Sequence, residues 1–482
     1  MVKISVSDMV RVTGADVALE VPGGVVEGVQ TDSRAVGAGM CFVCFAGERV
    51  DGNRFAPAAV EAGAAAVVMT REPDEELLAL ARERGCSVLR AKDDDPEEFM
   101  LRLAGAWRRM NPQWVVVGVT GSVGKTTTKD MLRASLATRY RVHATAGNFN
   151  NLIGLPLTIL SADSADEVLV CEMGMNHKGE LTRLAAAALP TVSLITNVGT
   201  SHIGLLGSRE NIARAKAEIV SGMRPTAEPQ SGVSPMLAMT SDNDYAPLIE
   251  REYAAPAGVA CVYVGTGEKD DVRASGVRLD GEGRPSFSLG FADGWSREVT
   301  LDVPGRAVVQ DFLLAMAVCD RLGVDRDAAA AAMEHMPRTG MRLEVIRTAG
   351  KPSMIDDSYN ASPSSIAAAL DVLCSMECAG RRVAVLGEVG ELGSESARLH
   401  GYIGAYAAAK PIDLLVLVGT DDARQMREAA LTMGFSEDRL ELFPDVESAV
   451  ATIGAVLGPD DLVLAKGSRS AGLDQFVKGV LA

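Results

Sequence analysis

The segment GVTGSVGKTTTKDML, residues 118–132, carries the strongest structural signal in the chain. The apolar run WVVVG that leads into it predicts a buried β-strand, and the residues after its lysine follow a pattern typical of a helix. A strand, a glycine-rich turn and a helix that begins at a Lys-Thr pair make up a phosphate-binding loop. In such a loop, backbone N–H groups converge on phosphate oxygens at the positive end of the helix dipole. The segment therefore predicts a site for a nucleoside triphosphate.

The side chains of this loop have separate tasks. Lys125 brings a positive charge to the outer phosphates, and the hydroxyl of Thr126 can hold Mg²⁺. The loop departs from the strict GxxxxGKT pattern, because Val119 stands where the first glycine is expected and an additional glycine is present at Gly121. The residues expected to contact the nucleotide are Val119, Thr120, Gly121, Ser122, Val123, Gly124, Lys125, Thr126 and Thr127. A phosphate-binding loop alone does not name a reaction.

Composition narrows the architecture and the partners of the chain. Its 482 residues are too many for one ordinary core, so we expect roughly two to four domains. Apolar residues make up 47% and aromatic residues only 4%, which suits layered α/β domains. The 47 Lys and Arg against 64 Asp and Glu give a net charge of −17, which argues against sequence-independent nucleic-acid binding. The spacing of the 8 cysteines indicates no disulfide framework, and we expect the spaced pairs Cys41/Cys44 and Cys374/Cys378 to be buried and reduced.

The sequence carries no signal for export or membrane insertion. Its first residues, MVKISVSDMVRVTG, lack the basic region and apolar core of a signal peptide. The best candidate for a membrane span, LAAAALPTVSLITNV, is interrupted by Pro190 and does not reach the ~20 apolar residues that a span needs. These features predict a cytoplasmic protein.

Alternating strand-like and helix-like segments divide the chain into three blocks. Residues 1–91 hold short apolar runs between helix-like segments. Residues 92–338 alternate in βαβ fashion, which predicts a parallel sheet with helices on both faces, and hairpin-like segments at 276–303 predict antiparallel strands appended to it. Residues 339–482 alternate again and predict a second parallel sheet. The expected fold class is α/β with three domains.

Polar residues follow three of the strands predicted in the central block. The turn GNFNNLIGLP carries Asn148, Asn150 and Asn151, Glu172 ends the run VLVC, and His202 lies on the loop after TVSLIT. Functional residues of parallel sheets lie at the carboxyl ends of the strands. A buried carboxylate at such an end needs a cation, for which Mg²⁺ is the obvious choice. The asparagines fit an ordinary turn equally well, and a lone histidine on a loop is more often structural.

At this point the chain resembles the Mur ligases, the ATP-dependent amide ligases of peptidoglycan precursor assembly. The resemblance rests on GVTGSVGKTTTK, GNFNNLIGLP, EMGMNHKGE and ITNVGTSHIGLLGSRENIARAKAEI. In the third block, MIDDSYNASPSSIAAAL, AVLGEVGELGSESARLH and LVLAKGSRSAGLDQFV are similar to the members that complete the peptide of the precursor. TDSRAVGAGMCFVCFAGERVDGNRF in the first block resembles the UDP-sugar-binding domain of the family. The resemblance covers nearly the whole chain in the expected order.

The resemblance implies a reaction and a set of partners. ATP phosphorylates a peptide carboxylate, an incoming amine attacks the acyl-phosphate, and the tetrahedral intermediate expels phosphate. The carboxylate belongs to a UDP-N-acetylmuramoyl-tripeptide and the amine to D-alanyl-D-alanine, so the chain would serve cell-wall biogenesis and thereby cell shape and division. The implied domains are a UDP-sugar-binding domain at 1–91, a central ATP-binding P-loop domain at 92–338 and a Rossmann-like ligase domain at 339–482. We expect the protein to be a monomer.

The resemblance also implies roles for single residues. Thr126, Glu172, His202 and Lys216 would surround a pair of Mg²⁺ ions. Lys216, in ENIARAKAEI, matches a lysine that is carbamylated in the family, so that CO₂ converts a group that repels Mg²⁺ into an anion that helps to hold it. Without this context, Lys216 fits a solvated helix lysine. The implied catalytic residues are Lys125, Lys216, His202, Glu172 and Arg342.

Further contacts are implied for the three substrates. Arg342 in GMRLEV matches an arginine near the nucleotide phosphates, and Asp357 and Asn360 in DDSYNASP would face the nucleotide or the reacting groups. The other implied substrate residues are Ser33, Arg34, Gly47 and Asp51 at the uridine end, Asn148, Asn150 and Asn151 in the asparagine turn, and Lys466, Ser468 and Arg469 on the side of the amine.

The chain departs from the family pattern where the base of ATP is expected. A PGRHNxxNALAA-type segment, whose amides help to hold the adenine side, reads PGRAVVQDFLLA here. Ala307, Val308 and Asp311 replace the usual polar residues, and Ser362 replaces an asparagine in the DDSYNASP signature. These departures concern binding and leave Lys125 unchanged.

Three other functions remain open from the sequence. Another ligase of the superfamily could add a different amino acid or act on folate, although the members that add the third residue carry a DYAHTP-type segment where this chain has DDSYNASP. A non-catalytic, nucleotide-binding regulatory protein would bind ATP without turnover. A small-molecule kinase would release ADP without forming an amide.

Overall fold

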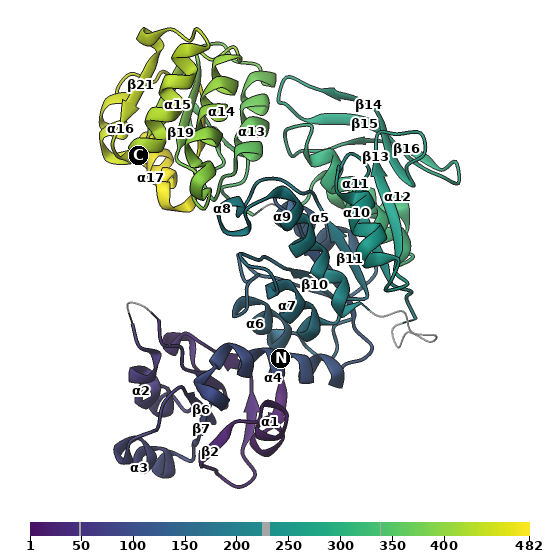
Figure 1. Cartoon of the computed structure of the whole chain (residues 1–482), viewed down its shortest axis with the longest axis vertical. Helices are drawn as coiled ribbons and strands as arrows, with labels where there is room; N and C mark the ends of the chain where they lie inside the picture. The colour runs from purple at the N-terminus through teal and green to yellow at the C-terminus, as the bar shows by residue number, and fades with distance from the viewer. Residues whose placement is uncertain (48–49, 224–231, 338) are drawn as a thin grey trace.

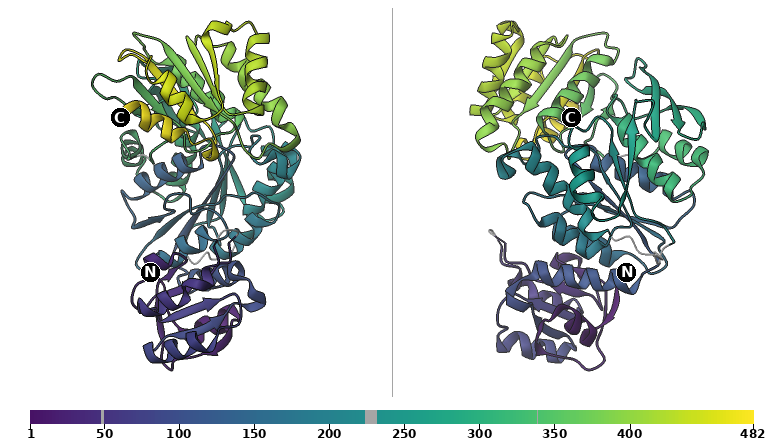
Figure 2. Two further views of the ribbon diagram at one scale, coloured as in Figure 1. Left: turned by 90° about the vertical axis from the view of Figure 1, so that its left-hand side faces the viewer. Right: turned by 45° about the vertical axis from the view of Figure 1, so that its right-hand side comes forward.

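The computed structural model describes residues 1–47, 50–223, 232–337 and 339–482. It consists of three α/β units that follow one another along the long axis of the molecule (Figure 1). The N-terminal unit and the C-terminal unit lie at opposite ends in both further views, with the central unit between them (Figure 2). The expected three-part α/β architecture is confirmed.

The N-terminal unit is built on a small sheet. Strands β4 to β7 are parallel and β2 is antiparallel to β7. In sheet order, the strands are β2 (Asp16–Leu19), β7 (Ser87–Arg90), β6 (Ala66–Met69), β5 (Cys41–Val43) and β4 (Val29–Gln30). The flanking elements are α1 (Val6–Thr13), α2 (Ala56–Glu61), α3 (Glu75–Arg84) and the two-stranded sheet of β1 (Lys3–Ser5) and β3 (Val25–Glu27).

The central unit contains a nine-stranded sheet. Its strands are parallel from β9 to β14, and the antiparallel pairs β14–β15 and β15–β16 extend it, as the hairpin-like sequence predicts. In sheet order, the strands are β16 (Ser296–Thr300), β15 (Pro285–Phe291), β14 (Val272–Leu279), β13 (Ala260–Gly265), β12 (Met236–Thr240), β11 (Val192–Ile195), β8 (Val115–Thr120), β10 (Val168–Glu172) and β9 (Val142–Ala144). The helices are α4 (Pro96–Met110), α5 (Lys125–Leu136), α6 (Gly154–Ser161), α7 (Glu180–Ala188), α8 (Ile203–Leu206), α9 (Arg209–Ala217), α10 (Ala246–Ile249), α11 (Val308–Arg321) and α12 (Arg326–Glu334).

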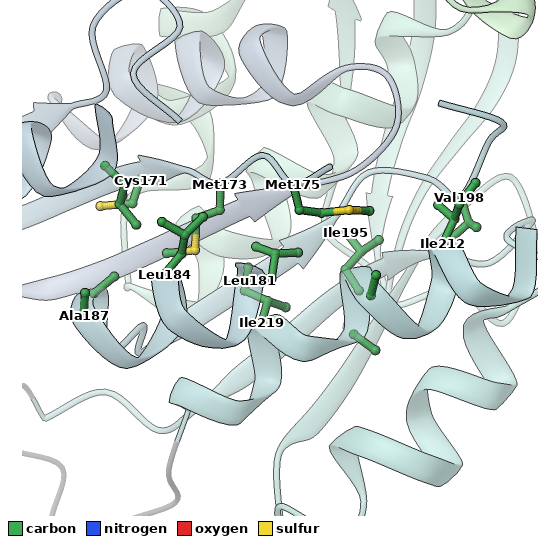
Figure 3. Packing of buried hydrophobic residues seen from close by; sticks show 14 of the residues in the cluster. Cys171, Met173, Met175, Leu181, Leu184, Ala187, Ile195, Val198, Ile212 and Ile219 are labelled. Carbon is green, nitrogen blue, oxygen red and sulfur yellow. The ribbon is translucent and has the colours of Figure 1, made fainter. Parts of the chain in front are cut away.

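Strand β8 shows why the central sheet forms. All six of its residues are buried, and a strand covered on both faces reads as a continuous apolar run. Val116 packs into the core beneath α4, α6 and α7, whereas Val117 and Val119 pack into the core beneath α5 and α11. Figure 3 shows the first of these cores, where Leu181 and Leu184 of α7 lie beside side chains at the end of β10.

The C-terminal unit holds a six-stranded sheet that is parallel except for its edge strand β17. In sheet order, the strands are β17 (Glu344–Ile346), β18 (Ser353–Asp356), β22 (Leu462–Lys466), β19 (Arg382–Gly387), β20 (Leu414–Val418) and β21 (Leu440–Phe443). The helices are α13 (Pro363–Ser375), α14 (Ser396–Ala408), α15 (Asp421–Thr432), α16 (Val446–Ile453) and α17 (Leu473–Leu481).

Two expectations from composition are tested by this fold. The cysteines are free, and Cys41 and Cys44 are buried, but Cys374 and Cys378 are partly exposed because they lie at the end of α13 and in the turn after it. The prediction that both spaced pairs are buried is therefore wrong for the second pair. Among the helices of the described residues, none has the length and apolar character that crossing a membrane requires.

Candidate functional site

A cleft of about 580 Å³ lies between the central and C-terminal units. Its central side is formed by the phosphate-binding loop and by the segments that follow β9, β10 and β11, and its C-terminal side by the segments around Arg342, β18, β19 and β22. The predicted site residues that line it are Ser122, Val123, Gly124, Lys125, Thr126, Thr127, Asn148, Asn150, Asn151, Glu172, His202, Arg342, Asp357, Asn360, Lys466, Ser468 and Arg469. The carboxyl ends of the strands of two sheets thus face one cavity, which is where parallel sheets bind ligands.

The loop between β8 and α5 is shaped by its glycines. A Cβ atom on Gly121 would lie 1.8 Å from Oγ1 of Thr196, so only glycine fits where the loop passes β11. Gly124 has a φ of +89° and is the N-cap residue of α5. The predicted residues Val119 and Thr120 belong to β8 and, with Gly121, do not contribute to the lining of the cleft. Backbone conformation therefore explains the glycine spacing that departs from the strict pattern.

Asn197 holds the same loop from the side and was missed by the sequence analysis. Its Oδ1 accepts a hydrogen bond from the Val123 N–H at 3.0 Å, and its Nδ2 donates to the Val123 carbonyl at 2.9 Å. Asn197 lies two residues after the end of β11, so the same strand-end argument that singled out His202 could have found it.

The ammonium group of Lys125 lies where it can bind an anion. Its Nζ donates to the carbonyl of Gly121 at 2.8 Å, which folds the side chain back over its own loop. Burial lowers the pKa of Lys125, the Glu172 carboxylate opposes this shift, and the Arg342 guanidinium adds to it. An anion bound at the loop would stabilise the charged ammonium, together with the N–H groups at the start of α5.

Glu172 and Thr126 offer oxygen atoms suited to a cation. The Glu172 side chain is 2% exposed, and it accepts hydrogen bonds from Thr126 Oγ1 at 3.0 Å and from Asn150 Nδ2 at 2.9 Å. Its partners are neutral, and a buried carboxylate without a cation is costly. No group of three or more His, Cys, Asp or Glu side chains converges as a metal site in the described part of the chain. These residues fit Mg²⁺ held by one carboxylate, a hydroxyl and the phosphates of a substrate.

Lys216 lies on α9, just outside the lining of the cleft. It is 2% exposed, and burial together with the nearby charge of Lys125 lowers its pKa far below the usual value. It forms no ion pair with Asp or Glu among the described residues. Its burial contradicts the solvated helix lysine that fits the sequence alone. Burial therefore favours the neutral amine of Lys216 over its charged ammonium form.

His202 reaches across the cleft. It has a φ of +64°, and its Nδ1 lies 2.6 Å from Oε2 of Glu391 in the C-terminal unit. The interaction with His202 lowers the pKa of Glu391. Close by, the Gly204 N–H donates to the Glu391 carbonyl at 3.0 Å, so the start of α8 also contacts the segment after β19. Glu391 was not among the predicted residues, because nothing in the sequence links it to His202.

The C-terminal unit contributes cations to the cleft. The Arg342 guanidinium lies 4.4 Å from the centre of the Tyr359 ring, and its Nε is buried without a hydrogen-bond partner among the described residues. Lys466 Nζ lies 2.5 Å from Oδ2 of Asp357 and 3.2 Å from the Asn360 carbonyl, so Asp357 and Asn360 hold Lys466 in place. An orphaned guanidinium nitrogen in a cleft fits an anionic ligand.

The remaining predicted residues of the cleft contact residues of their own unit. Ser468 Oγ donates to the Glu388 carbonyl at 2.7 Å, and Arg469 is 3.7 Å from Asp474 with its side chain largely exposed. Asn151 caps the turn before α6 through Gly154, at 2.8 Å, which is the structural role that an asparagine-rich turn predicts.

The four residues predicted for a uridine site lie in the N-terminal unit, away from this cleft. Arg34 is paired with Asp32 at 2.7 Å and its side chain is 88% exposed. Asp51 is 3.0 Å from Arg71 and accepts from the Asn53 N–H at 2.9 Å. Ser33 begins a short 3₁₀ helix after Asp32, and Gly47 lies near Asp51.

Three comparisons with known proteins agree with this arrangement. Residues 25–94 match the Mur ligase family catalytic domain, 119–319 the Mur ligase middle domain and 341–469 the Mur ligase glutamate ligase domain. The UDP-N-acetylmuramoyl-tripeptide–D-alanyl-D-alanine ligase of Bacillus subtilis (strain 168) is 36% identical over 99% of this chain and 97% of its own length. The ligase of the same name from Escherichia coli (strain K12) is 31% identical over 97% of this chain and 95% of its own length.

Solved structures show the same likeness along the whole chain. Crystal structure I of MurF from Acinetobacter baumannii superimposes with a TM-score of 0.86 at 28% identity, covering 100% of this chain and 99% of that one. The MurF ligase from Thermotoga maritima, in complex with ADP, superimposes with a TM-score of 0.77 at 25% identity, covering 95% and 97% of the two chains.

Proposed function

Because the chain belongs to the Mur ligase family, we propose that it joins D-alanyl-D-alanine to UDP-N-acetylmuramoyl-tripeptide at the expense of ATP, in peptidoglycan precursor synthesis. The protein is a ligase. The observation that carries the substrate assignment is the 36% identity, over 97% of its length, to a relative that bears this activity in its name. The cleft supports it, because one cavity brings together a phosphate-binding loop, an oxygen site for a cation and the cations of a second unit.

The reaction must bring two anions together. ATP binds with its phosphates on the loop between β8 and α5, and the carboxylate of the tripeptide approaches the terminal phosphate. Lys125 and Arg342 offset their repulsion, and they stabilise the charge that develops as the phosphoryl group moves. The carboxylate oxygen attacks the phosphorus and ADP leaves, which forms an acyl-phosphate. The amine of D-alanyl-D-alanine then attacks the acyl carbon, and phosphate departs as the amide forms.

Mg²⁺ fits between the loop and β10. Glu172 and Thr126 would hold it, with His202 near the second ion that the resemblance implies. The ion supplies charge neutralisation on the phosphates. A closed cleft excludes water from the acyl-phosphate, which would otherwise hydrolyse.

We assign Lys216 as the carbamylated lysine. Its neutral amine can attack CO₂, releasing one proton and leaving a carbamate anion on the side chain. Burial supports this step, because it lowers the pKa of Lys216 and so provides the uncharged nucleophile. The carbamate would also pair with Lys125, which faces Lys216 closely enough to lower its pKa.

The resemblance supports sites for the other substrates. Ser33, Arg34, Gly47 and Asp51 would bind the uridine end in domain 1–91, and Lys466, Ser468 and Arg469 the amine side in domain 339–482. Asn148, Asn150 and Asn151, in domain 92–338, would face the reacting peptide. We propose that the protein acts as a monomer. The use of ATP and of a UDP-linked precursor supports a reaction in the cytoplasm.

Release of ADP and phosphate tests the assignment directly. With ATP, Mg²⁺ and UDP-N-acetylmuramoyl-tripeptide, we expect sustained phosphate release only after D-alanyl-D-alanine is added, with one amide formed per phosphate. Measuring the same release with each variant of the third residue defines the tripeptide. Turnover with glutamate or diaminopimelate as the amine would instead indicate another ligase of the family. ADP formation without amide would indicate a kinase, and ATP binding without turnover a regulatory protein.

Replacing Arg342 by alanine should raise KM for ATP and lower kcat/KM by about 10²-fold, because a buried guanidinium donor to a developing anion is lost. Arg342→Lys should recover only part of this loss, since an ammonium lacks the planar fork of donors. The melting temperature of both variants should stay near that of the wild type. An unchanged KM for ATP in Arg342→Ala would remove this residue from the nucleotide site.

A further inference from the structure

Asp311 is a buried acid that the proposed mechanism does not use. It lies in the first turn of α11, is 9% exposed, and lines the cleft beside the phosphate-binding loop. The packing is close, since a Cβ atom on Gly124 would lie 2.3 Å from Oδ1 of Asp311. Asp311 therefore rests directly against the residue at which the loop becomes α5.

The hydrogen bonds around Asp311 favour a neutral acid. Among the described residues its one hydrogen-bond partner is Thr128, whose Oγ1 lies 3.1 Å from Oδ1. The same Oγ1 lies 2.9 Å from the carbonyl of Gly124, and a hydroxyl has a single hydrogen to donate. If Asp311 is protonated, its O–H donates to Thr128, and Thr128 donates to Gly124. An ionised Asp311 would compete with the Gly124 carbonyl for that hydrogen. The buried carboxylate would then have to share its one hydrogen-bond donor, which is costly.

We propose that protonated Asp311 positions the phosphate-binding loop through Thr128 and Gly124, so that nucleotide binding requires Asp311 to keep its proton. The inference rests on the proposed nucleotide site at this loop. Asp311 acts through Gly124 and is a positioning residue. The chain places it where the family pattern has an amide, and a protonated carboxyl group likewise offers one donor and one acceptor.

The surroundings of Asp311 agree with this assignment. Burial raises its pKa to about 8, and the hydrogen bond from Thr128 opposes the shift in part. No charged side chain of the described residues contributes to the shift. The helix α11 packs against α5, α12, β12, β13 and β14. The titratable groups on these elements are Lys125, Lys129, Asp130 and Arg133 on α5, Arg326, Asp327 and Glu334 on α12, Cys261 and Tyr263 on β13, and Arg273 and Arg278 on β14.

Several of these titratable groups form hydrogen bonds or ion pairs with residues other than Asp311. Lys125 donates to Gly121, and Lys129 is 3.0 Å from Asp130. On the other elements, Arg326 pairs with Asp320, Arg297 pairs with Asp327 and Glu334, Tyr263 donates to Glu250, and Arg273 donates to the Glu268 carbonyl. An ionised Asp311 would have no cation of its own, and its charge would repel the phosphates on the adjacent loop.

The ionisation of Asp311 determines how the affinity for nucleotide changes with pH. Below pH 7 Asp311 is already protonated, so the affinity for nucleotide should not depend on it. Above pH 8 the free protein loses the proton, and binding must take it back from solvent. With a pKa of about 8, the protonated fraction falls about tenfold between pH 7 and pH 9, so the apparent Kd should rise about tenfold.

The test measures the Kd of MgADP by calorimetry from pH 6.5 to 9.5 for the wild type and for Asp311→Asn. The asparagine amide donates to Thr128 at every pH, so the ratio of the wild-type Kd to the variant Kd should rise about tenfold from pH 6.5 to pH 9, whatever contact the new amide makes with the nucleotide. Ionisation of the nucleotide and of Lys125 is common to both proteins and cancels in the ratio. Parallel pH profiles would overturn the inference, whereas no binding at any pH would overturn the nucleotide site itself.

The pH dependence of stability tests separately whether Asp311 is protonated in the folded protein. The folded state holds a proton that the unfolded chain releases between its ordinary pKa of 3.8 and the folded value of about 8, so this group makes the free energy of unfolding fall as pH rises through that window. The difference in melting temperature between Asp311→Asn and the wild type should therefore grow from pH 5 to pH 8. A constant difference would show that Asp311 is ionised when folded. Thr128→Val, which breaks the relay, should weaken MgADP binding at pH 6.5 as well.

Discussion

Lys125→Ala is expected to lower kcat/KM for ATP by about 10³-fold or more, the largest effect of any single change in the phosphate-binding loop. The ammonium is the only side-chain cation that the loop itself carries, and it lies over the loop with its Nζ on the Gly121 carbonyl. The bound phosphates would draw it away from that carbonyl. Because the charge acts on the phosphoryl group in flight, kcat should fall more than the affinity for ADP, which the backbone N–H groups of the loop also hold.

Lys125→Arg is the matched control. It keeps the positive charge but is larger and planar, so we expect only partial recovery. Steady-state kinetics give kcat and KM, and calorimetry gives the affinity for MgADP. A Lys125→Ala variant with wild-type kcat would show that the loop does not serve the transferred phosphate. A lost melting transition would instead show a folding defect.

The fold was largely predictable because its strands are apolar on both faces. Continuous apolar runs such as VVVGVT at 115–120 predict buried strands without any need for an alternation of polar and apolar residues. Glycines mark the turn that follows. The pattern RENIARAKAEIVSGM at 209–223 predicts one continuous helix, but α9 ends at Ala217 and a 3₁₀ helix follows from Glu218 to Gly222. A Cβ atom on Gly222 would lie 2.3 Å from the carbonyl of Ala185, so contact with α7 shapes this end.

The site was predictable where one rule covers several residues. The ends of parallel strands meet at one edge, and this rule brought Lys125 and Glu172 together from sequence alone. Contacts between units follow no such rule. Glu391 meets His202 only because the C-terminal sheet faces the central one, and no spacing in the sequence encodes that approach. Asp311 stands out in the sequence as a departure, but its contact with Gly124 depends on how α11 packs against α5.

Lys216→Met is expected to lower kcat by roughly 10²–10³-fold in the ligase reaction, with little change in the affinity for MgADP. Methionine fills most of the volume of the buried lysine, so packing beside α9 is kept while the nucleophilic amine is lost. Lys216→Ala should lose the same activity and also some stability, because it leaves a cavity. The comparison of the two variants separates the chemistry of the amine from its contribution to the core.

Carbamylation itself has a direct readout. With isotopically labelled bicarbonate, carbon NMR of the native enzyme should show one carbamate resonance that is absent from Lys216→Met. Wild-type activity should fall in buffer freed of CO₂ and return when bicarbonate is added, whereas the variant should not respond. The amine must be neutral to react, and burial lowers its pKa, so the signal should persist at neutral pH and not only in strong alkali. Full activity of Lys216→Met, or a resonance that it retains, would place the carbamate elsewhere and leave Lys216 as a buried amine beside Lys125.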